Sequence, residues 1–151
     1  MRNVLLIILL LTLSGCATVI SREARQGADI TVTPAMAQRE PDAYREKKVI
    51  WTGTIVSIKN LREKSIIEVD HLPSEKTAGE PESGASSSRF LVDTVGFLDP
   101  EIYRKGLKIV TAGIIRGLII GKLNEKEYPY PVIEPVEIHL YTDHGGSPSS
   151  P

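Results

Sequence analysis

The chain is poor in three features that would have placed it in large classes of protein. It has one cysteine among 151 residues, so no internal disulfide can form, and a secreted chain with one cysteine needs another use for it. It also lacks an excess of basic residues, since 18 Lys and Arg stand against 19 Asp and Glu. That balance, without a Lys/Arg cluster along the chain, argues against a nucleic-acid partner and against electrostatic binding to acidic lipid.

The third scarcity is a hydrophobic run long enough to span a bilayer. Residues 4–13 (VLLIILLLTL) are almost unbroken aliphatic sequence. At ~1.5 Å per residue they cover roughly half of a ~30 Å hydrocarbon core. The run follows a short start with one basic residue, Arg2. Its length and flank are those of a signal peptide, so residues 1–15 are predicted to be removed from the mature protein.

The aliphatic run passes directly into Leu13-Ser14-Gly15-Cys16. Small residues at positions 14 and 15 let a chain enter a peptidase site in extended form, and a cysteine thiol can become a thioether that carries diacylglycerol. The pattern resembles the lipobox of bacterial lipoproteins, which implies cleavage before Cys16 and acylation of the new amino group. The alternative, an ordinary signal peptide with a chance cysteine, leaves the agreement of basic start, run length and motif unexplained.

Three acyl chains, palmitate among them, are expected on Cys16. Each buried CH₂ contributes ~0.8 kcal/mol and one chain anchors only marginally, so three would hold the protein at a membrane almost irreversibly. Ala17 stands where an aspartate would favour inner-membrane retention in enteric bacteria. The predicted location is therefore the outer membrane, on its periplasmic side.

The mature chain has the size and composition of one modest domain, with 41% hydrophobic and 25% charged residues overall. Residues 16–28 are polar without a clear period and are expected to form a lipidated tether. Residues 29–142 carry the predicted strands and form the domain, and residues 143–151 read as a disordered Gly/Ser/Pro tail. Thr33 before Pro34 resembles a helix N-cap, which predicts a short N-terminal helical segment.

Five segments show strand patterns, rich in β-branched residues or alternating in polarity. They cover residues 49–58, 65–71, 89–94, 107–120 and 132–141. Gly53 in the first is expected to ease the bend of a long strand that serves two sheets, and Pro135 in the last suggests a bulge or an edge. In that last strand Val136, Ile138 and Leu140 are expected to face inward.

A short helix is expected between the third and fourth strands. Asp99 would cap it, Pro100 would take the first helical position and Gly106 would end it. Five strands with a short helix in that place is the order of an OB-fold. The sequence therefore predicts an all-β protein, a small OB-like five-stranded barrel.

Three glycines recur at four-residue spacing in the fourth strand segment: Gly113, Gly117 and Gly121. This spacing also occurs in close-packed transmembrane helices. The segment is short and carries Arg116 in its middle, so a bent strand with glycines at points of curvature is favoured.

Much of the chain resembles the Slp family of outer-membrane lipoproteins, named for a starvation-inducible member. The residues that carry the resemblance are Trp51 to Ile55, Ile67 to Val69, Leu72-Pro73, Arg89-Phe90, Gly96 to Pro100, Tyr103, Gly106, Gly113, Gly117, Gly121 to Leu123 and Tyr128 to Ile133. The chain departs from the family pattern at Ile50, Thr52 and Asn124. The resemblance implies a location and a context, starvation or envelope conditions, and brings no established catalytic activity.

Aromatic side chains could offer a stacking surface for a sugar or peptide, as some OB-folds do. Trp51, Tyr128 and Tyr130 are the candidates for such a ligand face. In a small barrel these side chains more often fill the core, so both interpretations stay open.

No catalytic set, metal site or cofactor is expected. His71 beside Asp70, and His139 near Asp143, lie on different elements without the tight ligand spacing of a zinc site, and are expected to be surface residues. Residues 86–88 are serines in a loop segment, which supplies neither a base nor a rigid turn for a nucleophile.

The leading hypothesis is a non-enzymatic envelope lipoprotein with a structural or adaptor role in starvation or envelope stress. Its partners would be the membrane, through the lipid, and an envelope protein. One rival is a periplasm-facing binding module for a small envelope ligand, such as a saccharide, a peptide or a metal ion. A second rival is a hydrolase, for which the sequence offers least.

Overall fold

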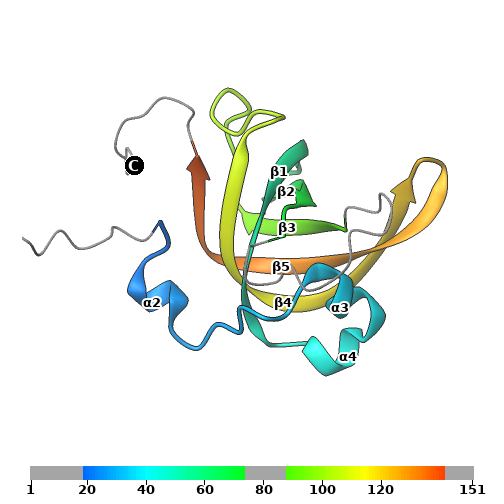
Figure 1. The fold of residues 1–151 in the computed structure, drawn as a ribbon. Coiled ribbons are helices and arrows are strands. Elements are labelled where there is room, and N and C mark those ends of the chain that lie inside the picture. The colour runs from blue at the N-terminus through cyan, green and yellow to red at the C-terminus, as the bar shows by residue number, and fades with distance from the viewer. Residues whose placement is uncertain (1–18, 74–87, 142–151) are drawn as a thin grey trace, which may run out of the picture.

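The computed structural model describes residues 19–73 and 88–141, which form a closed five-stranded barrel with three short helices before it (Figure 1). The helices are α2 (Arg22–Arg25), α3 (Pro34–Arg39) and α4 (Pro41–Tyr44). The strands are β1 (Lys48–Asn60), β2 (Lys64–His71), β3 (Arg89–Val95), β4 (Lys108–Leu123) and β5 (Lys126–Tyr141). The predicted small all-β barrel is confirmed.

The strands follow one another around the barrel in the order β1-β2-β3-β5-β4. Every neighbouring pair is antiparallel except β3 and β5, whose parallel pairing joins Leu91 to Val132 and Val92 to Ile133. This short parallel contact closes the sheet and removes its open edges there.

β1 serves two neighbours, as its sequence predicted. Its first half pairs with β4 and its second half with β2, and Gly53 and Thr54 pair with both. At Gly53 the two ladders meet so closely that a Cβ would lie 2.3 Å from the carbonyl oxygen of Asp70. Only glycine allows this approach of backbones.

β4 bends at two places where its register with β5 shifts, next to Gly113 and next to Gly117. Gly117 has φ +127°, a conformation that side chains rarely adopt. The prediction of a bent strand, rather than a transmembrane helix, is confirmed. None of the helices within residues 19–73 and 88–141 has the length and apolarity needed to cross a membrane.

β4 and β5 are longer than predicted because they continue as a projecting two-stranded hairpin (Figure 1). Asn124 and Glu125 turn the chain with φ of 50° and 64°, the left-handed pair that a tight hairpin turn requires. Pro129 and Pro131, expected to precede the last strand, lie within it and pair with β4 residues. Prolines are tolerated there because the far side of β5 has no full-length partner.

One inward-facing expectation is wrong. Val136 is 53% exposed, whereas Ile138 and Leu140 pack against the core as predicted. Ala112 pairs with Glu137 and Gly113 with Pro135, so Val136 is the extra residue of a bulge and turns outward.

The prediction of a short helix between β3 and β4 is also wrong. This segment forms turns, in which the amides of Ile102 and Tyr103 both donate to the Asp99 carbonyl. The Gly106 amide then donates to the carbonyl of Ile55, so the chain returns to β1 before a second helical turn can form.

The core fills the barrel and continues beneath the helices. Its buried residues are Val32, Ala37, Val49, Trp51, Ile55, Ile67, Val69, Phe90, Val92, Ile109, Ile115 and Ile133. The predicted N-terminal helical segment is present as two helices, α3 and α4. The Thr33 hydroxyl caps α3 by accepting from the Met36 amide. Ala37 of α3 is fully buried, which fixes this segment against the barrel.

The described part of the expected tether is packed rather than free. Ile20 and Ala24, each 2% exposed, lie against Val110 and Ala112 on the outer surface of the barrel. Residues 20–25 of the expected lipidated tether are held to the barrel because two apolar side chains one helical turn apart pack on an apolar strip of β4.

Candidate functional site

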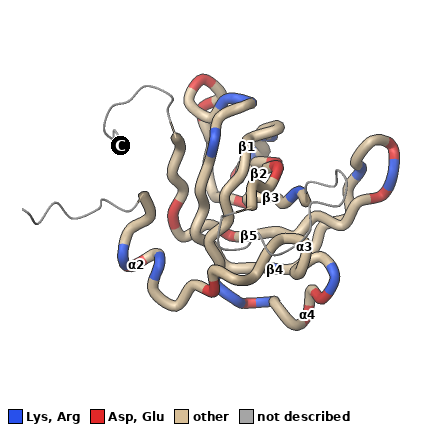
Figure 2. Tube along the Cα trace, in the orientation of Figure 1, with Lys and Arg blue, Asp and Glu red and all other residues tan. Residues whose placement is uncertain are grey.

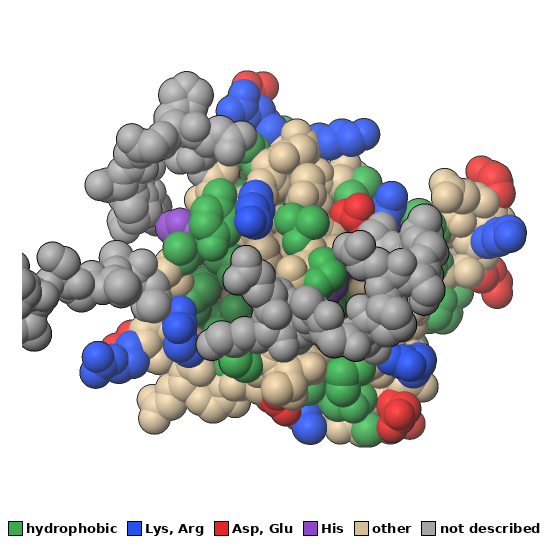
Figure 3. Space-filling model, in the orientation of Figure 1, with side chains coloured by type: hydrophobic (Ala, Val, Ile, Leu, Met, Phe, Trp, Pro, Cys, Tyr) green, Lys and Arg blue, Asp and Glu red, His purple; other side chains and the backbone are tan. Residues whose placement is uncertain are grey.

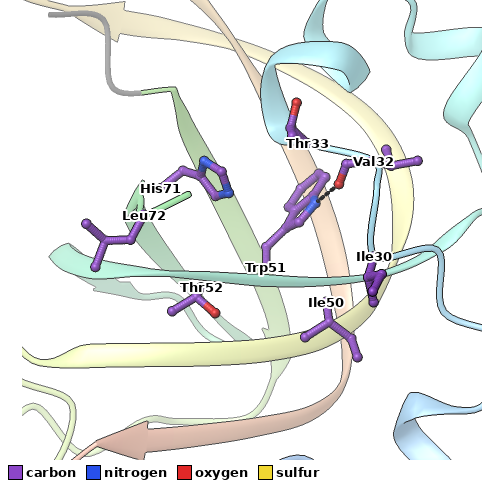
Figure 4. A pocket seen from close by; sticks show the side chains of 8 residues that line it. All are labelled: Ile30, Val32, Thr33, Ile50, Trp51, Thr52, His71 and Leu72. Carbon is purple, nitrogen blue, oxygen red and sulfur yellow. Dashed lines mark hydrogen bonds between the residues drawn. The ribbon is translucent and has the colours of Figure 1, made fainter. Parts of the chain in front are cut away.

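Trp51, one of the three candidate ligand residues, is an interior side chain. It is 2% exposed, and its ring packs edge-on against Phe90 with the centroids 5.1 Å apart. Its Nε1 donates to the Val32 carbonyl oxygen at 2.7 Å (Figure 4). Trp51 thus joins β1 to the chain segment before α3, and its faces are occupied by protein.

A small hollow lies beside Trp51 where that segment crosses the end of the barrel (Figure 4). Its lining residues are Ile30, Val32, Thr33, Ile50, Trp51, Thr52, His71 and Leu72. Its volume of about 20 Å³ is room for about one water molecule. A sugar or a peptide side chain does not fit this hollow.

His71 is the titratable group at this hollow, and it is half-buried instead of lying fully at the surface as expected. Burial lowers the pKa of His71 to about 4, although the nearby Asp70 carboxylate acts in the opposite direction. The imidazole is therefore neutral at pH 7, and its ring lies edge-on to Phe90 at 6.4 Å. This environment disfavours the cationic form of the imidazole and suits a side chain that packs against the core.

Tyr128 and Tyr130 lie elsewhere, at the base of the β4–β5 hairpin, so the three candidates do not share one face. Their rings meet edge-on with centroids 4.7 Å apart. Gly121 on β4 makes room for the Tyr130 ring, because a Cβ there would lie 2.9 Å from it. The Tyr128 hydroxyl accepts from the Arg89 amide at 3.0 Å.

A charged pair on β2 and β3 completes this cluster. Arg89 Nη1 lies 2.7 Å from Glu68 Oε1, and both side chains are mostly buried. The Tyr130 hydroxyl donates to the same carboxylate oxygen at 3.2 Å. The hydrogen bond to Glu68 raises the pKa of Arg89, and burial followed by the Glu68 charge raises the pKa of Tyr130.

We name Glu68, Arg89, Tyr128 and Tyr130 the hairpin brace, since each contacts another member and together they hold the hairpin against β2 and β3. Sequence reasoning found its tyrosines and missed its ion pair. The signal was available in the alternation: Glu68 and Arg89 both point away from the inward-facing residues of their strands. Antiparallel pairing of these strands would have placed them close together.

Metal binding finds no support in the part of the chain that the structure describes, where no group of three or more His, Cys, Asp or Glu is placed to hold an ion. The His139 ring packs edge-on against Tyr141 at 5.8 Å. Asp143, and the serines at 86 and 87, lie outside the described residues.

Leu13, Ser14, Gly15 and Cys16, the predicted cleavage and lipidation residues, also lie outside the described residues. What the structure describes is the point where the chain from Cys16 meets the barrel. The Ser21 amide and hydroxyl donate to the two oxygens of Glu137 at 3.0 and 2.5 Å. The Ser21 hydroxyl also accepts from the Ala24 amide, capping α2, and the hydrogen bonds from Ser21 lower the pKa of Glu137.

Comparison with known proteins finds one matching family model and two relatives. A family model described as "Outer membrane lipoprotein Slp family" matches residues 13–149. The chain is 30% identical over 130 residues to the "Uncharacterized lipoprotein YeaY" of Escherichia coli (strain K12), covering 82% of this chain and 64% of that one. It is 31% identical over 97 residues to an "Uncharacterized protein" of Haemophilus influenzae, covering 64% of this chain and 52% of that one.

The chain spans between half and two thirds of the length of these curated relatives. The family match covers almost all of the chain, from Leu13 to residue 149. The resemblance drawn from the sequence motifs is confirmed: this chain belongs to the outer membrane lipoprotein Slp family.

Proposed function

We propose that this protein is a non-enzymatic lipoprotein, held by acyl chains on Cys16 at the periplasmic side of the outer membrane. Its barrel would serve as a structural or adaptor component of the envelope under starvation or envelope stress. The observation that carries the proposal is Leu13-Ser14-Gly15-Cys16 directly after an apolar run of signal-peptide length. The family match includes this motif.

The docked N-terminal segment supports a role that depends on position at the membrane. The two hydrogen bonds from Ser21 to Glu137 and the burial of Ile20 hold residues 20 and 21 against the barrel wall, a few residues after the proposed anchor. Between Cys16 and Ser21 an extended chain spans at most ~18 Å. The proposed anchor would therefore keep the barrel close to the lipid surface, because no long flexible linker separates the two.

A structural role is also consistent with how the charged groups of the barrel are used. The charged and hydroxyl groups of the hairpin brace bond to one another and to neighbouring strand residues, with the Tyr130 hydroxyl also 3.1 Å from the Lys122 carbonyl and Glu68 also accepting from the Ser57 hydroxyl. Arg116 on β4 is similarly held by Glu46 and Glu134, at 2.5 and 2.8 Å. The pKa of Arg116 is raised by these two carboxylates, Glu134 first. A binding module for a small ligand would have to use the outer surface, because Trp51 fills the interior.

The test replaces Cys16 by serine in the full-length protein, expressed in a Gram-negative host. Serine cannot form the thioether, so Cys16→Ser should accumulate as uncleaved precursor and be lost from the outer-membrane fraction of a density gradient. Ser14→Ala is the matched control, since it keeps a small residue in the same motif and should be processed normally.

The same strains test the orientation. Protease added to intact cells should leave the wild-type protein whole, and protease added after permeabilising the outer membrane should degrade it. Normal maturation and outer-membrane fractionation of Cys16→Ser would refute the lipoprotein proposal.

A further inference from the structure

One end of the barrel exposes large apolar side chains on a rigid support. The β1–β2 turn carries Leu61 (40% exposed), Val95 (90%) is the last residue of β3, and the loop after β3 carries Phe97 (71%) and Ile102 (56%). We call these four residues the apolar tip. Isolated exposed hydrophobic residues are ordinary, but several on two adjoining loops are typical of a contact surface.

Hydrogen bonds show that the two loops form one unit. The Gly96 amide donates to the Glu63 carbonyl at 2.9 Å, and the Asn60 side-chain amide pairs with both the amide and the carbonyl of Leu98, at 3.2 and 2.9 Å. Ser65, which is fully buried, donates from its hydroxyl to the Gly96 carbonyl at 2.7 Å. The exposure of Val95 and Phe97 is therefore built into the fold by these bonds, and is not fraying of a loose loop.

Basic residues surround the apolar tip. Residues 59–64 and 95–108 together hold six Lys or Arg and three Asp or Glu, although the whole chain carries a net charge of −1. The basic residues are Lys59, Arg62, Lys64, Arg104, Lys105 and Lys108, of which Lys64 forms an ion pair with Asp93 of β3 at 2.6 Å. Figure 2 shows Lys and Arg at this end, above β1 and at the start of β4, together with acidic residues in the same loop, and Figure 3 shows both signs of charge over the visible face. Although the balance of charge along the sequence argued against binding to acidic lipid, apolar side chains with basic residues around them suit the boundary of an anionic lipid surface.

The N-terminal segment lies on the outer wall of the barrel, between the start of β1 and the start of β4: Lys48 Nζ donates to the carbonyls of Glu23 and Gln26, both at 3.1 Å. Ile20 packs on Val110 and Ala112, while Lys108, two residues before Val110 on β4, stands where the tip loop joins the strand. At ~3.3 Å per residue these contacts are roughly 7–13 Å from Lys108 along β4. The chain between Ser21 and Cys16 is long enough to cover that distance. The β4–β5 hairpin lies on the opposite side of the barrel from α2 (Figure 1).

From these observations we infer that the apolar tip is a second membrane contact: Val95, Phe97 and their neighbours enter the lipid surface that holds the Cys16 acyl chains. The inference rests on the proposed lipid anchor and goes beyond it, because it assigns one orientation of the barrel. The anchor and the tip would fix two points of the domain at the bilayer. The hairpin, with exposed Ile119 and Ile120, would then point into the periplasm.

The test uses the mature acylated protein in vesicles of phosphatidylethanolamine and the anionic phosphatidylglycerol, with and without brominated acyl chains. Bromine quenches tryptophan only at short range, and the native Trp51 is buried in the barrel and gives the background. Phe97→Trp places a reporter in the tip, and Val95→Trp repeats the test at a second position. Ile120→Trp is the matched control, since Ile120 is also largely exposed (63%) but lies in the hairpin.

We expect brominated lipid to reduce the emission of Phe97→Trp and Val95→Trp well below that of the wild-type protein and of Ile120→Trp. Equal quenching in all variants, or quenching at the hairpin alone, would overturn the tip assignment while leaving the anchor intact. Protein that carries no acyl chains by mass and does not stay with the vesicles would instead refute the proposed function, and the tip assignment with it.

Discussion

Gly53→Ala is expected to lower the free energy of unfolding by about 3 kcal/mol or more, at the upper end of what overpacking costs. The added methyl group would lie 2.3 Å from the carbonyl oxygen of Asp70 and 2.4 Å from a methyl carbon of Val69. The oxygen belongs to the backbone of β2 where β1 pairs with it. It cannot move away without separating the two strands.

Urea unfolding followed by the fluorescence of the single tryptophan measures this effect. Gly96→Ala is the matched control, because Gly96 has φ +88° but nothing within 4 Å of an added Cβ. Gly96→Ala should lower the free energy of unfolding by about 1–2 kcal/mol, the cost of holding alanine in the left-handed conformation. A smaller loss in Gly53→Ala than in Gly96→Ala would contradict the close approach of β1 and β2.

Trp51→Ala is expected to cost about 3–5 kcal/mol, the range for removing a large buried aromatic side chain. The substitution leaves a cavity against Phe90 and removes the 2.7 Å hydrogen bond to Val32. Trp51→Phe should cost less, because it keeps most of the side-chain volume. Its remaining cost is the buried carbonyl left without its donor, about 1–3 kcal/mol.

Circular dichroism during urea unfolding measures both variants, since the fluorescent residue is gone. Val136→Ala serves as the control and should stay within about 0.5 kcal/mol of the wild type, because Val136 is half exposed. A Trp51→Ala protein as stable as this control would show that the barrel interior does not depend on Trp51, and would reopen its use as a ligand residue.

Much of the barrel was predictable because its signals are local. Alternating polarity placed Ile67 and Val69 inside β2, and the β-branched run around Gly53 predicted a long bent strand with two neighbours. The glycines of β4 predicted curvature at Gly113 and Gly117, where the structure has its register shifts.

The errors arose where a distant partner decides the local structure. Asp99, Pro100 and Gly106 carry good helix signals, yet the Gly106 amide is taken by Ile55 on β1. Val136 would face inward in a regular strand, and the pairing of its neighbours with β4 makes it a bulge residue. Neither partner can be identified from a window of sequence around the residue itself.

The candidate site shows the same division. Sequence identified Trp51, Tyr128 and Tyr130 as aromatic candidates but could not tell that Trp51 points into the barrel while the tyrosines brace the hairpin from outside. The apolar tip with its basic rim was missed because its two segments are more than 30 residues apart in the chain. Each segment alone looks like an ordinary loop.

The measurement that tests the account most directly is the mass of the N-terminal peptide of the mature protein, extracted from its own envelope in detergent. The account predicts that this peptide begins at Cys16 and carries diacylglycerol on the thiol and a further acyl chain on the amino group. A mature protein that begins at another residue, or a Cys16 with a free thiol, would contradict it and leave the barrel without its membrane anchor.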